Sequence, residues 1–188
     1  GKEHITVSQK LYYNPNPNLS VLVYGSSFFM NTYDLIQDMT FSQARDWTAG
    51  TKVTYHVKDW FSVTGSLHAD FYDRFKRHER IDKRQKDYES SIYQPRLTVT
   101  SNYFNGHSLI LGMEHTSDEL TSDRFSGNAN HDLKTRALKE TEYFLQDEWT
   151  INPRWMISAG IRTNFSKAFG FMGMPKVAAK YSPDKHWS

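Results

Sequence analysis

The stretch QDEWTINPRWMISAGIR, residues 146–162, places one tryptophan on each side of a short turn signal. Trp149 precedes Asn152-Pro153-Arg154 and Trp155 follows it, and Asn and Pro are typical turn residues because they suit the backbone angles of a chain reversal. After the turn, Trp155, Ile157, Ala159 and Ile161 alternate with Met156, Ser158, Gly160 and Arg162. Alternation of period two predicts a strand with one apolar and one polar face. The stretch therefore predicts a β-hairpin.

The same alternation runs through most of the chain. It is clearest from Phe61 to Phe75, where only Asp73 interrupts the apolar face, and Asp147 makes a second interruption beside Trp149. A β-bulge would explain either interruption. The first two strands are expected at about 3–13 and 19–31. We predict an all-β fold, an antiparallel up-and-down meander of about nine or ten strands.

Short and long connections alternate along the sequence. Five are short, at 14–18, 58–60, 105–106, 152–154 and 182–185, and between them lie longer polar stretches at about 32–44, 76–90, 117–139 and 167–173. In an up-and-down sheet this order puts every short turn at one end. Outer-membrane barrels have that layout, with short periplasmic turns and long external loops.

Aromatic residues gather beside the short turns. Amphipathic rings prefer the boundary between membrane and water, where the ring is in apolar surroundings and its N–H or O–H stays hydrated. Trp47 is the one tryptophan away from a short turn. The predicted membrane-interface anchors are Tyr13, Trp60, Phe61, Tyr103, Trp149, Trp155, Tyr181 and Trp187.

Composition narrows the classes of function. The 188 residues include no cysteine, so a disulfide framework and a thiolate metal site are excluded. The net charge of +2 is too small to indicate a nucleic-acid partner. No run of about 18 apolar residues predicts a transmembrane helix. We predict no metal site and no cofactor.

Other classes of protein fit parts of the pattern. Alternation alone also fits a soluble or surface β-sheet module for ligand binding or adhesion. Predicted strands of about ten residues favour a tilted membrane strand over the shorter strands of soluble sheets. Together with the alternating connections and the aromatic residues at one end, they predict that the meander forms part of a transmembrane β-barrel. An outer-membrane barrel enzyme is the second alternative. His68 and Asp70 share a strand face with serine and threonine residues, but the sequence contains no serine-elbow motif, so we predict no enzyme activity.

From residue 138 onward, the sequence resembles the TonB-dependent outer-membrane receptors. The resemblance rests on a strand ending in Gln146-Asp147-Glu148-Trp149, a short turn, and a strand containing Gly160-Ile161-Arg162. Gly173-Met174-Pro175-Lys176 and the turn Tyr181-Ser182-Pro183 follow in the order typical of that family. The earlier strands agree in style only.

The resemblance implies a receptor that imports a scarce nutrient, such as a ferric siderophore, haem or cobalamin, across the outer membrane of a Gram-negative bacterium. Such receptors have a barrel of about 22 strands around a plug domain. We expect residues 1–188 to form a single piece of the barrel wall, without the plug domain and the C-terminal strands. The implied partners are the TonB system (through the absent plug), the ligand and membrane lipid. Open sheet edges also permit self-association.

The ligand-binding candidates lie on the predicted inward face near the long loops and in one of those loops. An arginine can pair with an anionic siderophore, and a ring can stack on a catecholate or porphyrin. The candidates are His68, Tyr72, Arg74 and Arg162 on strands, with Asp70 and Asn164 beside them, and Arg124, Phe125 and His131 in a loop. The basic run at 74–86 is interpreted as a solvated external loop.

Overall fold

The computed structural model describes residues 1–33, 40–78, 83–122, 125 and 133–183. They form one sheet of nine antiparallel strands in which every strand pairs with its neighbours in sequence. The strands are β1 (Lys2–Asn16), β2 (Leu19–Tyr33), β3 (Thr40–Lys58), β4 (Phe61–His78), β5 (Lys83–Ser101), β6 (His107–Ser122), β7 (Lys134–Asn152), β8 (Trp155–Ser166) and β9 (Gly170–Tyr181). The predicted all-β meander is confirmed.

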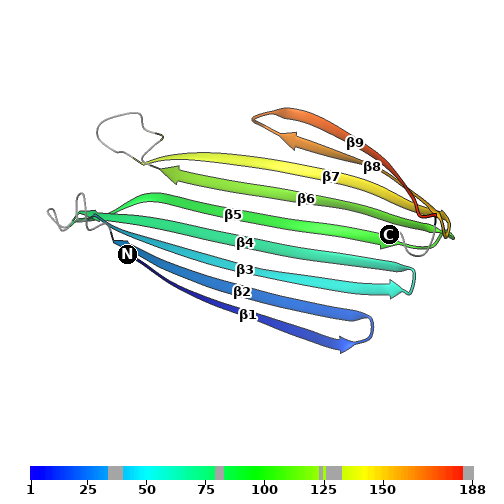
Figure 1. The fold of residues 1–188 in the computed structure, drawn as a ribbon, viewed down its shortest axis with the longest axis horizontal. Helices are drawn as coiled ribbons and strands as arrows, with labels where there is room; N and C mark the ends of the chain where they lie inside the picture. The colour runs from blue at the N-terminus through cyan, green and yellow to red at the C-terminus, as the bar shows by residue number, and fades with distance from the viewer. Residues whose placement is uncertain (34–39, 79–82, 123–124, 126–132, 184–188) are drawn as a thin grey trace.

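The short turns gather at one end of the sheet, as the sequence predicts. Figure 1 shows the β1–β2, β3–β4, β5–β6 and β7–β8 turns together on the right and the C-terminal ends of β2, β4 and β6 on the left. We call these the short-turn end and the loop end. The last hairpin is shorter than the others, because β8 and β9 have 12 residues each while the other strands have 15 to 19.

The long loops predicted from the sequence include residues that belong to strands in the structure. β3 already begins at Thr40, β4 continues to His78, β5 begins at Lys83 and β9 begins at Gly170. Polar residues extend these strands because the backbone ladder does not depend on apolar side chains. The period-two pattern fades where the side chains on both faces become polar, so it does not mark the strand end. The basic run at 74–86 accordingly lies largely within β4 and β5.

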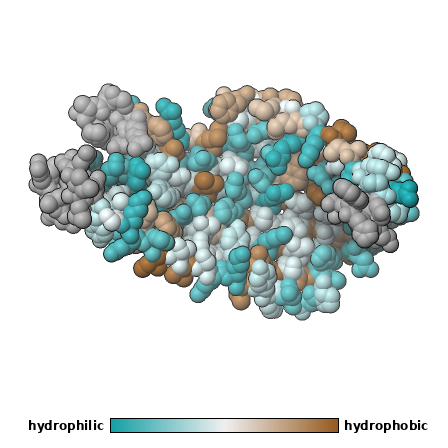
Figure 2. Space-filling view, viewed as in Figure 1, coloured by the Kyte–Doolittle hydropathy of each residue, from teal (hydrophilic) through white to brown (hydrophobic). Residues whose placement is uncertain are grey.

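The two faces of the sheet differ in polarity. We call the face with Phe61, Leu67 and Phe71 the apolar face and the opposite one, with His68 and Tyr72, the polar face. Large hydrophobic side chains of the apolar face are uncovered; Leu67 is 46% and Leu111 51% exposed. Among the described residues, Ala44 is the only buried hydrophobic residue. The middle strands present a predominantly hydrophilic face in Figure 2. The described sheet therefore has no hydrophobic core of its own.

Neither interruption of the apolar face is removed by a bulge. The β4–β5 ladder does shift register, but between Arg74 and Phe75, where Asp87 of β5 is left without a ladder partner. Asp73 stays on the apolar face at the loop end, where its Oδ1 lies 2.7 Å from Lys86 Nζ. The proposed bulge was thus wrong as an explanation of Asp73.

Asp147 also stays on the apolar face, because the register of β7 with both neighbours is regular around it. Its Oδ2 lies 2.8 Å from His107 Nδ1, and the His107 ring stacks on Trp149 with centroids 5.2 Å apart. The carboxylate is therefore partnered beside the short-turn end.

No helix in the described part of the chain is long and apolar enough to cross a membrane.

Candidate functional site

The candidate ligand site is a hollow on the polar face at the loop end. It has a volume of about 470 Å³ and is formed by three adjacent strands, β3, β4 and β5. Its lining residues, the loop-end hollow from here on, are Asp46, Asp70, Tyr72, Arg74, Tyr88 and Ser90. Alternation in β4 places Asp70, Tyr72 and Arg74 on one face, so three predicted residues meet here.

One side of the loop-end hollow is held by the bulge residue Asp87. Arg74 donates to both carboxylate oxygens, at 3.2 Å from Nε and at 2.8 Å from Nη2 to Oδ2. Lys76 Nζ lies 3.0 Å from the same Oδ2, and the Asp87 side chain is only 3% exposed. Burial would raise the pKa of Asp87, but the hydrogen bonds from Arg74 and Lys76 outweigh it and lower the pKa. The carboxylate thus fixes two cations.

Two tyrosine rings complete that side. The Arg74 guanidinium carbon lies 5.4 Å from the centre of the Tyr88 ring, within the range of a cation–π contact. Tyr72 and Tyr88 meet edge to face with centroids 5.5 Å apart. The planar cation and both rings therefore form one continuous surface.

The other side of the hollow is acidic. Asp70 Oδ2 accepts a hydrogen bond of 2.8 Å from the Thr48 hydroxyl, and Asp46 lies beside this pair on β3. Among the described residues, no three histidine, aspartate or glutamate side chains are grouped as a metal site requires. The hollow offers a cationic and a carboxylate side to one ligand.

His68 lies on the same face but outside the hollow. Its Nδ1 lies 2.9 Å from the hydroxyl oxygen of Tyr24, on β2. The Tyr24 ring reaches it by lying across Gly50, in the space that a side chain there would occupy. The predicted candidate is therefore tied into a contact that spans β2, β3 and β4.

Arg162 and Asn164 lie on β8, three strands away from the hollow's last strand β5. Arg162 Nη2 lies 2.9 Å from Glu142 Oε1, and Asn164 Nδ2 donates to Glu140 Oε2 at 3.1 Å. The structure does not bring these two residues together with Tyr72 and Arg74.

The loop candidates are only partly described. The Phe125 ring lies 4.5 Å from the guanidinium carbon of Arg136, near the start of β7. Arg124 and His131 lie outside the described residues.

The predicted interface anchors form ring contacts at the short-turn end. Trp60 lies 4.8 Å from Tyr103 and 5.8 Å from Phe61, and Trp155 lies 4.6 Å from Tyr181, measured between ring centroids. We call these rings, with Trp149, the short-turn row. Tyr13 is 62% exposed on β1. Trp187 lies outside the described residues.

A second aromatic row on the apolar face was missed. Phe71, Tyr93, Phe165 and Phe171 stand ten positions along the chain from Phe61, Tyr103, Trp155 and Tyr181. Phe71 meets Tyr93 at 5.3 Å and Phe165 meets Phe171 at 5.0 Å. Trp47, the apparent exception in sequence, pairs with Phe71 across the β3–β4 ladder. These five rings form the loop-end row, which a search for equal spacing along each strand would have found.

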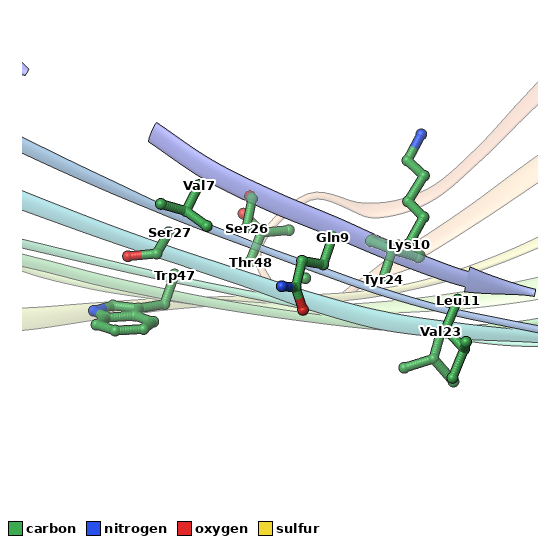
Figure 3. A pocket seen from close by; sticks show the side chains of 11 residues that line it. Val7, Gln9, Lys10, Leu11, Val23, Tyr24, Ser26, Ser27, Trp47 and Thr48 are labelled. Atoms are coloured by element: carbon green, nitrogen blue, oxygen red, sulfur yellow. The ribbon is translucent and has the colours of Figure 1, made fainter. Parts of the chain in front are cut away.

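The two faces are also visible where β1, β2 and β3 meet. Figure 3 shows Trp47, Leu11 and Val23 extending to one side of the ribbons and Lys10 to the other. These residues border a hollow of about 810 Å³. The alternation predicted from sequence thus separates the side chains in space as well.

Sequence reasoning also missed Asp87 and Tyr88. Both lie in a segment predicted as a loop, and strict alternation cannot put two consecutive residues on one face. A bulge does so, because its extra residue shifts the alternation by one. In the sequence, Arg74 and Lys76 belong to the basic run at 74–86, and Asp87 is the residue that follows this run.

Comparisons with known proteins agree with this architecture. The crystal structures of the siderophore receptor PirA from Pseudomonas aeruginosa and from Acinetobacter baumannii match 98% of the chain, with TM-scores of 0.75 and 0.76 and sequence identities of 12% and 10%. The structure of BauA, the ferric preacinetobactin receptor from Acinetobacter baumannii, matches 95% of the chain with a TM-score of 0.65 and 11% identity. At these identities the likeness concerns the fold.

The chain spans about a third of those structures: 31%, 32% and 36% of their lengths. No curated protein sequence matches it. The sequence profile described as "TonB dependent receptor-like, beta-barrel" matches residues 5–188, nearly the whole chain. The resemblance predicted from residues 138 onward is confirmed, and the chain belongs to the TonB-dependent receptor β-barrel family.

Proposed function

We propose that the nine strands form part of the wall of an outer-membrane receptor for a ferric siderophore. In this arrangement the apolar face contacts lipid and the polar face lines the lumen. The exposed Leu67 and Leu111 suit a lipid environment. The two aromatic rows lie ten positions apart, which matches the roughly 9–11 residues of a membrane-spanning strand.

The main support for a siderophore as the ligand is the loop-end hollow. Siderophores bind iron through anionic oxygen atoms and often carry aromatic rings. The Arg74 guanidinium provides positive charge, and Tyr72 and Tyr88 provide ring surfaces beside it. Two of the solved structures with the same fold are described as siderophore receptors and the third as a ferric preacinetobactin receptor, which supports this class over haem or cobalamin. Their description as receptors also supports transport over catalysis.

The test is uptake of ⁵⁵Fe by the source bacterium with the gene deleted and restored. Ferric catecholate, hydroxamate and mixed siderophores, haem and labelled cobalamin are supplied separately under iron limitation. We expect at least one ferric siderophore to require the gene and to require TonB. Uptake that persists without TonB would indicate a passive pore instead of a TonB-dependent receptor. Loss of haem or cobalamin uptake alone would contradict the siderophore class.

A matched pair of variants tests the site itself. Tyr88→Leu removes a ring of the loop-end hollow, and Tyr24→Leu removes a polar-face tyrosine outside it. We expect Tyr88→Leu to weaken binding of the transported siderophore about tenfold, since ring contacts of this kind contribute about 1 kcal/mol or more. Equal losses in the two variants, at equal amounts of protein in the membrane, would assign both to general folding.

A further inference from the structure

A second hollow lies on the polar face among β5 to β9. Its volume is about 560 Å³, within the range of small-molecule sites. The residues that matter for the argument are Arg96, Phe144, Gly160, Arg162 and Lys176, and we call this hollow the Phe144 groove. It shares no lining residue with the loop-end hollow.

The groove is built around the ring of Phe144. Gly112 has no side chain, and the ring lies in the space that a side chain there would occupy. The guanidinium carbon of Arg96 lies 4.8 Å from the ring centre and that of Arg162 lies 6.0 Å from it. Contact with a ring restrains a guanidinium while its N–H groups remain available to an acceptor. One ring thus positions two cations from β5 and β8.

The charged side chains that line the groove are all cations: Arg96, Arg162 and Lys176. Glu114 lies 3.5 Å from Arg96 and Glu142 lies 2.9 Å from Arg162, so each guanidinium already has one carboxylate partner. Lys176 has no hydrogen bond or ion pair with any described residue. Glu148, the ladder partner of the lining residue Ser158, accepts a hydrogen bond of 2.9 Å from Gln146. Lys176 therefore supplies positive charge without a partner at the groove wall.

We propose that the Phe144 groove binds the carboxylate of a small planar anion. Arg96 and Arg162 are forks that match the two oxygens of a carboxylate, and Lys176 adds a point charge. The groove lies deeper in the wall than the loop-end hollow, since Phe144 is five positions from Trp149 of the short-turn row. That the groove is a second contact for the transported ligand rests on the proposed function. That it binds a carboxylate does not.

The test uses the natural-length protein in detergent with benzoate as the probe, followed by saturation-transfer NMR and titration. Benzamide is the uncharged analogue. We expect benzoate to bind and benzamide to bind at least tenfold more weakly, because a charged hydrogen-bonded contact contributes roughly a factor of ten or more. Lys176→Gln should weaken benzoate binding by about the same factor.

Lys180→Gln is the matched control, because Lys180 lies on the same face of β9 but does not line the groove. Phe144→Leu keeps an apolar side chain and should also weaken benzoate binding, since the two guanidinia lose their support. No benzoate signal, equal binding of benzamide, or equal losses in Lys176→Gln and Lys180→Gln would each overturn the proposal. These binding measurements do not depend on transport. A failure of siderophore uptake can therefore be distinguished from a failure of benzoate binding.

Discussion

Asp87, a bulge residue without a ladder partner, contacts two cations of β4, although strict alternation from Tyr88 would have put its side chain on the opposite face. Its carboxylate is almost completely buried, and Arg74 and Lys76 both reach it from β4. The negative charge makes a dense patch of positive charge compatible with folding. At this scale the loop-end hollow depends on one bulge residue.

Asp87→Asn should lower the free energy of unfolding by about 1–3 kcal/mol, the range for a hydrogen bond to a charged group together with its lost partner. The measurement is thermal or denaturant unfolding of the natural-length protein in detergent at neutral pH. Asp118→Asn is the control, because Asp118 lies on the same face and has no ion pair among the described residues. A loss no greater than that of the control would count against the role of Asp87.

The contacts of Asp87 with Arg74 and Lys76 also predict that the stability of the protein depends on pH. The folded pKa of Asp87 lies below its ordinary value of 3.8, so the stabilising contribution is complete above that value. It is lost as the pH falls through the lower folded pKa, because the unfolded state then binds more protons. The stability difference between the natural protein and Asp87→Asn should therefore shrink below about pH 4. A difference that stays constant from pH 6 to pH 3 would contradict this assignment.

Gly112→Ala tests how the Phe144 groove is built. A Cβ there would meet the Phe144 ring and would lie 2.8 Å from the Leu97 carbonyl oxygen. We expect a loss of about 1–3 kcal/mol in unfolding free energy, typical of overpacking, together with weaker benzoate binding. Gly65→Ala is the control, since a Cβ at that position has no neighbour within 4 Å. Equal stability of the two variants would show that the ring moves aside freely.

At the scale of the strand, adjacent residues face different surroundings. Leu67 lies on the apolar face, between Phe61 of the short-turn row and Phe71 of the loop-end row, and Ser66 lies on the polar face. Leu67→Arg should cost about 2–4 kcal/mol in a bilayer, the value for arginine near the middle of a lipid-facing strand. Ser66→Arg should cost much less. Unfolding in lipid vesicles measures both, and similar costs would refute the assignment of faces.

The strands themselves were predictable, because alternation depends only on each residue and its two neighbours. Their ends were not, since a ladder continues through polar residues such as those of β4 beyond Phe75. The bulge at Asp87 was also beyond reach, because it is defined by the register of β5 against β4. His68, Tyr72 and Arg74 share the polar face of β4, as alternation predicts. Their partners Tyr24, Tyr88 and Asp87 depend on contacts between strands.

At the scale of the whole molecule, the described sheet is open. β1 and β9 each pair with one neighbour only, so each has an unpaired edge in the described chain. Exposed edges invite pairing with another chain. We expect residues 1–188 expressed alone to self-associate in detergent, with an apparent mass that rises with concentration in sedimentation experiments. The natural-length protein is the control. A concentration-independent monomer of the isolated chain would show that the edges are protected.

The equal spacing of the aromatic rows has a consequence for the membranes that this sheet can occupy. Ten residues of a strand measure about 33 Å along its axis, and a tilt of about 45° reduces their height to roughly 23 Å. That height is close to the apolar band of about 25 Å on outer-membrane barrels. In a thicker bilayer, the hydrocarbon layer would exceed the height between the two aromatic rows at every strand. Strands joined in a ladder cannot change their tilt independently to compensate. The row spacing would thus restrict the protein to thin membranes, independently of any targeting signal.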